Sequence, residues 1–338
     1  MMDILKKIFG FIFAILFIST AVTALFLFNF DRRAFTAEMY QKTFAREDFY
    51  DKLPAVMAEA VISTTADQNQ FPIVLRGMSQ DGWEAFFRTV LPQETLKAMG
   101  DDILSSTFAY LNRKTNSVQL SLTPLKVSMV SDTGVQAVFT LLKTQPDCTL
   151  QQIGQMTLNL FTKSDLQLCN PPEETVPLLT PVIQGQMQVV SLAIPDQITL
   201  ASAPLENDPR VKLQTARILM RLSPIIPLAL LLLMTIFAVN SLKSWLGWWG
   251  IPFFITGGIA SVMSLSGAPI FGAVLERILV DRMPDYLPTI LLDYTRDLAA
   301  AMLKALLTPV LWQGLVIALV GFVMALVSFF IKSNQQKP

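Results

Sequence analysis

The chain has 338 residues, of which 52% are hydrophobic and only 15% are charged, which is too apolar a composition for an ordinary soluble protein. Lysine and arginine together number 26, as do aspartate and glutamate, so no net positive charge exists to attract nucleic acid, and we exclude it as a partner. Histidine is absent, which removes the commonest general base and the usual zinc ligand.

Four stretches free of charged residues are long enough to cross the roughly 30 Å hydrocarbon core of a lipid bilayer as helices. Pro224 and Pro227 lie near the start of the second, where a membrane helix tolerates a kink. A tryptophan cluster precedes the third and is typical of the membrane interface, so we begin that span at Ile251. We predict transmembrane helices at residues 8–30, 222–242, 251–269 and 305–331.

The first of these stretches has a second interpretation as a cleaved signal peptide. Lys6 and Lys7 would form its basic start, and Ser19-Thr20-Ala21 or Val22-Thr23-Ala24 resembles a cleavage site. The apolar run nevertheless continues through Phe28, where a processed protein would normally turn polar. We therefore expect a membrane anchor, and cleavage would leave the rest of the topology unchanged.

Charge placement predicts the side of the membrane on which each segment lies. The short segments carry lysines opposed by a single acid, Asp3, which is the positive-inside pattern. We therefore place residues 1–7 and the tail 332–338 in the cytoplasm, and residues 31–217 outside the cell membrane. Arginines also flank the outer domain, but the positive-inside rule no longer predicts orientation beside a domain longer than about 60 residues. The lysines are Lys6, Lys7, Lys243, Lys332 and Lys337, and the arginines are Arg32, Arg33, Arg217 and Arg221.

The domain at 31–217 is expected to be mainly helical. Helices are predicted to begin near Asp48, Ser79, Pro92 and Thr123, where capping residues or proline precede apolar residues at helical spacing. Apolar and polar residues alternate at 118–122, which predicts a short strand, and Gln197 to Leu200 is a second candidate. The predicted fold class is mostly α, with four transmembrane helices and at most a small two-stranded sheet in the outer domain.

Between the third and fourth spans, residues 270–304 stay outside in this topology. Ile290, Tyr294, Leu298 and Met302 fall on one helical face, while the charged residues fall elsewhere. The pattern is typical of an amphipathic helix that lies on the membrane or under the outer domain.

Cys148 and Cys169 are the two cysteines of the chain, and both fall in the segment placed outside. An even pair closes readily under oxidising conditions, so we expect a disulfide. The alternative is a pair of unpaired buried thiols.

Small residues recur along the third and fourth spans. Such stripes let helix backbones approach closely, and we interpret them as the contact between these two helices within one chain. An oligomer interface and a lipid groove are the alternatives. The residues are Ala260, Ser264, Ala268 and Gly272 on one helix and Gly314, Ala318, Gly321 and Ala325 on the other.

No pattern in the chain predicts catalysis. Several acidic pairs, such as Asp101 and Asp102, lie where helices begin or on solvated surface, and the spacing of a calcium loop is missing. The spans carry no ionisable residue at mid-bilayer, which argues against active transport. We therefore predict no catalytic residue, no cofactor and no bound metal, and we expect a protein that is not an enzyme.

Four short motifs of the outer domain carry a resemblance to known proteins. They are Val118-Gln119-Leu120-Ser121-Leu122-Thr123-Pro124-Leu125, Pro146-Asp147-Cys148, Cys169-Asn170-Pro171-Pro172 and Ile194-Pro195-Asp196. On these motifs the domain resembles that of a family of uncharacterised bacterial membrane proteins, in which one exported, helical domain with paired cysteines lies between the first and second transmembrane helices. The resemblance covers about the middle third of the chain, and it implies an exported domain without an assigned activity.

The function hypothesis is an extracytoplasmic interaction or sensing module whose partners are the lipid bilayer and another membrane or exported protein. The alternative is a subunit of a transport complex with the layout of mechanically coupled ABC permeases. Against it, the turn at 240–244 offers an ATPase almost no cytoplasmic surface. An exported enzyme that uses carboxylates alone is a third, weaker hypothesis.

Overall fold

The computed structural model describes residues 2–63, 79–143, 145–149, 151–154, 169–204, 206–282 and 289–331. The chain divides into two compact units. We call residues 1–39, 204–278 and 296–338 the helical unit, and residues 40–203 with 279–295 the domain unit. The predicted outer domain, 31–217, is therefore wider than the compact one, because both of its flanks belong to the helical unit. The predicted tail at 332–338 lies outside the described residues.

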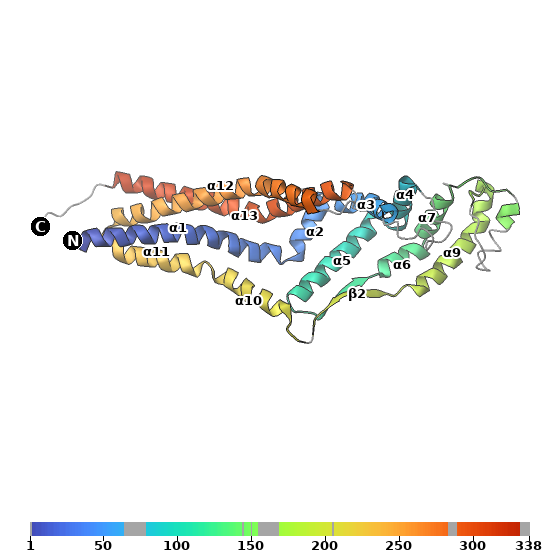
Figure 1. Cartoon of the computed structure of the whole chain (residues 1–338), viewed down its shortest axis with the longest axis horizontal. Coiled ribbons are helices and arrows are strands. Elements are labelled where there is room, and N and C mark those ends of the chain that lie inside the picture. Colours follow the sequence, from blue (N-terminus) through green and yellow to red (C-terminus); the bar gives the residue numbers. More distant parts are fainter. Residues whose placement is uncertain are drawn as a thin grey trace. The chain divides into compact units, whose positions relative to one another are not determined.

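Long apolar helices build the helical unit (Figure 1). α1 packs along α11, and α10 packs against the end of α1. Their bounds are α1 Met2–Ala34, α10 Pro209–Leu222, α11 Ile225–Ala238, α12 Leu242–Arg282 and α13 Thr289–Phe330.

Within the described residues, four helical segments are long and apolar enough to cross a membrane, which confirms the four predicted spans and marks the chain as an integral membrane protein. They are Lys6–Ala34, Pro209–Ala238, Leu242–Val274 and Tyr294–Phe330. The segment 270–304, predicted as an amphipathic segment outside the membrane, contains the end of α12 and the start of α13 where it is described, and its place relative to the membrane stays a prediction. Adding a turn to an existing helix is easier than nucleating a new one, so both long helices extend past the predicted spans.

Short helices and one small sheet build the domain unit. α3 begins one residue after Asp48, and α4 begins after Ser79, whose hydroxyl accepts a hydrogen bond from the Gly82 amide at 3.2 Å. The elements are α2 Ala37–Arg46, which starts in the helical unit, α3 Phe49–Ser63, α4 Gln80–Val90, α5 Gln93–Leu111, β1 Ser117–Ser121, α6 Thr123–Val130, α7 Asp132–Lys143, η3 Glu173–Thr175, α9 Val176–Ala193 and β2 Gln197–Ser202.

The two predicted strands pair as an antiparallel two-stranded sheet, so the predicted fold class is confirmed. Ser117 pairs with Ser202 and Ser121 with Gln197, with an irregularity between Val118 and Gln119. Val118 is buried, because β1 packs against α5. The alternation of apolar and polar residues therefore predicted correctly which face of this strand is buried.

A buried cluster around Tyr50 forms the core of the domain unit, with Val90, Leu91, Leu96 and Ala137. The Tyr50 ring lies against the backbone of α5 at Gly100, and a Cβ there would approach the Tyr50 hydroxyl oxygen to 2.6 Å. Burial, reinforced by the Asp101 carboxylate, raises the pKa of Tyr50 to about 12. The hydroxyl therefore stays neutral at physiological pH.

Replacing Gly100 with alanine is expected to destabilise the domain unit by about 1 to 3 kcal/mol, because the buried Tyr50 ring has little room to move away. Gly185 is the matched control, since a Cβ at this position of α9 meets nothing within 4 Å. Gly185→Ala should leave stability unchanged or raise it slightly. Chemical denaturation of both variants checks the prediction, and equal effects would contradict the packing described.

Candidate functional site

The two cysteines of the chain form a disulfide, Cys148–Cys169, which confirms that prediction. The segments on either side of it are joined by backbone hydrogen bonds, from the Cys148 amide to the Asn170 carbonyl at 2.9 Å and from the Asn170 amide to the Pro146 carbonyl at 2.8 Å. The Asn170 side-chain amide also donates to Asp147 Oδ1 at 2.8 Å. Two of the sequence motifs thus meet at one cross-link, and Cys169 packs with Leu179 of α9.

The small residues of α13 lie against α12. A Cβ on Gly321 would approach the Phe254 amide nitrogen of α12 to 2.3 Å, and one on Gly257 would approach the Ala318 amide nitrogen to 2.3 Å. A Cβ on Gly250 would approach the Ala325 amide nitrogen to 2.7 Å. The backbones of the two helices therefore pack directly on each other.

On α12 the close approach is at Gly250 and Gly257 rather than along the whole predicted stripe. Ala260 and Ser264 are buried, but a Cβ on Gly272 would meet nothing within 4 Å. A strict spacing of four residues turns the stripe by about 120° between Ala260 and Gly272, because an α-helix turns about 100° per residue. The spacing of four, three and four on α13 turns by only about 20°, so that stripe stays on one face.

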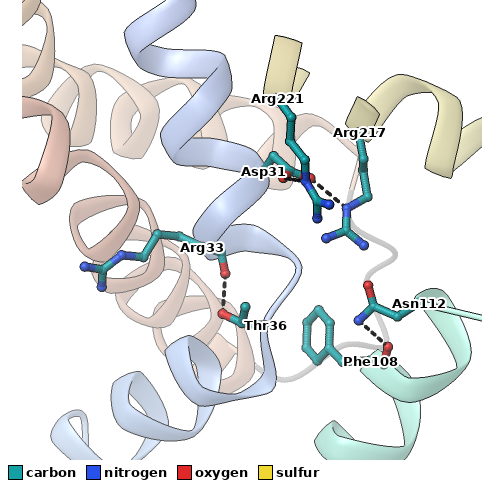
Figure 2. Close-up of polar contacts among 7 residues, drawn as sticks. All are labelled: Asp31, Arg33, Thr36, Phe108, Asn112, Arg217 and Arg221. Carbon is teal, nitrogen blue, oxygen red and sulfur yellow. Dashed lines mark hydrogen bonds and ion pairs between the residues drawn. The ribbon is translucent and has the colours of Figure 1, made fainter. Parts of the chain in front are cut away.

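A charged cluster, defined by Asp31, Arg217 and Arg221, lies in the helical unit where the end of α1 meets α10. The Arg217 Nε donates to Asp31 Oδ1 at 2.7 Å, and the Arg221 Nε donates to Asp31 Oδ2 at 2.6 Å. Figure 2 shows both guanidinium groups at the Asp31 carboxylate, while the side chain of Arg33 points away from it. The Asp31 side chain is 1% exposed, and that of Arg221 is 57% exposed.

Two aromatic rings lie against guanidinium groups near this end of α1. The guanidinium carbon of Arg217 lies 4.5 Å from the ring centre of Phe35, and that of Arg32 lies 4.5 Å from the ring centre of Phe28. Two guanidinium groups and one carboxylate leave the cluster with a net charge of +1, and Arg32 adds a positive charge beside Phe28. Guanidinium groups bind anions such as carboxylate and phosphate, and here two of them attach α10 to the Asp31 carboxylate of α1.

The helix α10 buries two of its charged residues and exposes several of its apolar ones. Arg210 and Arg217 are buried, whereas Ile218, Leu219 and Leu222 are at least half exposed. A helix in water would bury its apolar face, so this pattern is typical of a segment surrounded by lipid. It agrees with the membrane-crossing segment that begins at Pro209.

An amide pair connects α1 to α13 two residues before the charged cluster. The Asn29 Nδ2 donates to Gln313 Oε1 at 2.7 Å, and the Gln313 Nε2 donates back to Asn29 Oδ1 at 3.3 Å. Neither residue was predicted as a site residue from the sequence. Each is an isolated polar residue in an apolar span, and that signal predicts a polar partner on a neighbouring helix.

In the domain unit, β2 is exposed along its whole length, and we call Gln197–Ser202 the β2 edge. The outer side of β1 is covered by α5, because the amide of Gln119 donates to Ser106 Oγ at 2.9 Å. The outer side of β2 pairs with no strand among the described residues. Ile198 and Leu200 are 40% and 50% exposed there.

No group of three or more acidic, cysteine or histidine side chains in the described part of the chain is placed to hold a metal ion. No family model, curated protein or solved structure matches the chain. The class of protein is therefore defined by the fold and these sites alone. The protein is an integral membrane protein with four apolar spans and a mainly helical domain unit that contains one disulfide.

Replacing Gly257 with alanine is expected to push α12 away from α13 and to lower the stability of the helical unit by about 1 to 3 kcal/mol. Gly258 is the matched control, because a Cβ there meets nothing within 4 Å, and Gly258→Ala should be nearly neutral. Thermal unfolding in detergent compares the two. A change in oligomer size without a loss of stability would show instead that the stripe joins separate chains.

Proposed function

We propose that the chain is a membrane-anchored interaction or sensing module whose domain unit binds another exported or membrane protein at the β2 edge. Proteins usually protect an exposed edge strand with charges, proline or a covering element. The β2 edge contains neither a charged residue nor proline, and all six of its residues are exposed. This unprotected edge is the observation that carries the proposal, since such an edge binds an extended segment by strand addition.

Exposed apolar side chains precede the β2 edge in the chain and support the same reading. Val189 and Leu192, at the end of α9, are 62% and 78% exposed. A partner strand would form backbone hydrogen bonds with β2, while Ile198 and Leu200 would supply contacts that select its side chains.

We propose that the domain unit lies outside the cell membrane. Lys6, Lys7 and Lys243 lie in short segments on the opposite side of the spans, which is the positive-inside arrangement. The disulfide supports this placement, because such bonds persist in oxidising compartments.

The competing proposal is a permease subunit driven by a cytoplasmic ATPase. Only Val239–Ser241 separate α11 from α12, so this connection offers an ATPase almost no docking surface. That observation favours the interaction module.

Site-specific photocrosslinking tests the proposal. Benzoylphenylalanine at Ile198 or Leu200 should capture the same partner protein, whereas the probe at Lys97, an exposed position on α5, should not. Changing Ile198 and Leu200 together to lysine should abolish co-purification of that partner and leave the melting temperature unchanged, because both side chains are exposed. Equal capture at Lys97, or co-purification of an ATPase in place of an edge-bound partner, would contradict the proposal.

A further inference from the structure

An apolar groove of 270 Å³ lies within the helical unit. α1 lines it from Phe17 to Phe28, Pro224 just before α11 and Leu228 of α11 contribute, and α12 and α13 complete the wall. Apart from Thr256, every described residue of the lining is apolar. A groove of this composition between membrane helices accommodates hydrocarbon rather than a polar solute.

The length of the groove matches one leaflet of a bilayer. From Phe17 to Phe28, α1 rises about 16 Å, at about 1.5 Å per residue. This is about half of the roughly 30 Å hydrocarbon core. The deep end lies where the Phe17 ring stacks on Phe253, with 5.5 Å between ring centres. The groove therefore runs from near the middle of the membrane toward the end that carries the charged cluster.

Positive charge lies at the shallow end of the groove. The Arg32 guanidinium lies over the ring of Phe28, which is the last lining residue of α1. Arg221 precedes Pro224 by three residues, and its bond to Asp31 is made through Nε, so its half-exposed guanidinium has further N–H groups to donate. A planar guanidinium binds phosphate oxygens in a bidentate manner.

We propose that this groove binds an anionic phospholipid, with one acyl chain between the helices and the phosphate on Arg32 and Arg221. The apolar wall and the length of the groove, about that of one leaflet, fit the acyl chain. The guanidinium groups of Arg32, over the lining residue Phe28, and of the half-exposed Arg221 select the anionic head group. The site lies wholly within the helical unit and is independent of the β2 edge.

The direct test uses the full-length protein in phosphatidylcholine nanodiscs that contain a minority of phosphatidylglycerol with a photoreactive acyl chain. Labelling should map to residues between Phe17 and Phe28 and between Pro224 and Leu231. The same photoreactive chain on phosphatidylcholine should label these residues about tenfold less, because it lacks the net negative charge.

Two matched pairs of variants separate the head-group site from the chain site. Arg32→Gln with Arg221→Gln should reduce groove labelling by phosphatidylglycerol about tenfold, whereas Arg33→Gln, on the same turn of α1, should not. Leu228→Trp should block the groove, whereas Leu232→Trp should not, because Leu232 is 62% exposed and does not line it. Melting temperatures in detergent verify that each variant is folded.

Equal labelling by the two lipids, or an equal effect of Arg33→Gln, would overturn the proposal. Competition by inorganic phosphate would show a site for free anions and would overturn the lipid assignment as well. Loss of labelling in Leu232→Trp but not in Leu228→Trp would place the acyl chain elsewhere on the helices.

Discussion

The buried Asp31 carboxylate is the constraint on which the arrangement of the helical unit depends. A carboxylate removed from water has a large desolvation cost, which hydrogen bonds to both of its oxygens offset. Arg217 and Arg221 supply these bonds from α10, 186 and 190 residues further along the chain. Removing only the carboxylate or only the arginines would leave an uncompensated buried charge. The ion pairs therefore hold the end of α1 to α10.

Other features of the helical unit follow from this attachment. Once the end of α1 is fixed to α10, Asn29 is placed to pair with Gln313 of α13, and α11 continues alongside α1. The arginines that neutralise Asp31 exceed it in charge, so the same contact leaves positive charge beside the apolar groove. One interaction thus provides both the attachment of the helices and the head-group end of the proposed lipid site.

Much of the fold could be predicted from the sequence, because its signals are local. Uncharged runs gave the four spans, alternation at 118–122 gave β1, and an even cysteine count gave the disulfide. Asp31 was only the first residue of the predicted outer domain and Arg217 only a flanking charge, since nothing local indicates a pair separated by 186 residues. Gly272 was misplaced because small residues spaced by four leave the contact face, whereas Gly250 and Gly257, spaced by seven, stay on it. Likewise, the β2 edge became visible only when the structure showed which side of each strand is covered.

The measurement that tests the account most directly is a double-mutant cycle on Asp31 and Arg217, followed by thermal unfolding in detergent. Asp31→Asn and Arg217→Gln should each destabilise the protein, and the double variant should lose less than their sum, with a coupling energy of about 1 to 3 kcal/mol. Arg33→Gln paired with Asp31→Asn is the control and should show additive effects, because Arg33 points away from the carboxylate. Additive losses for Asp31 and Arg217 would contradict the central claim that this buried ion pair holds α1 to α10.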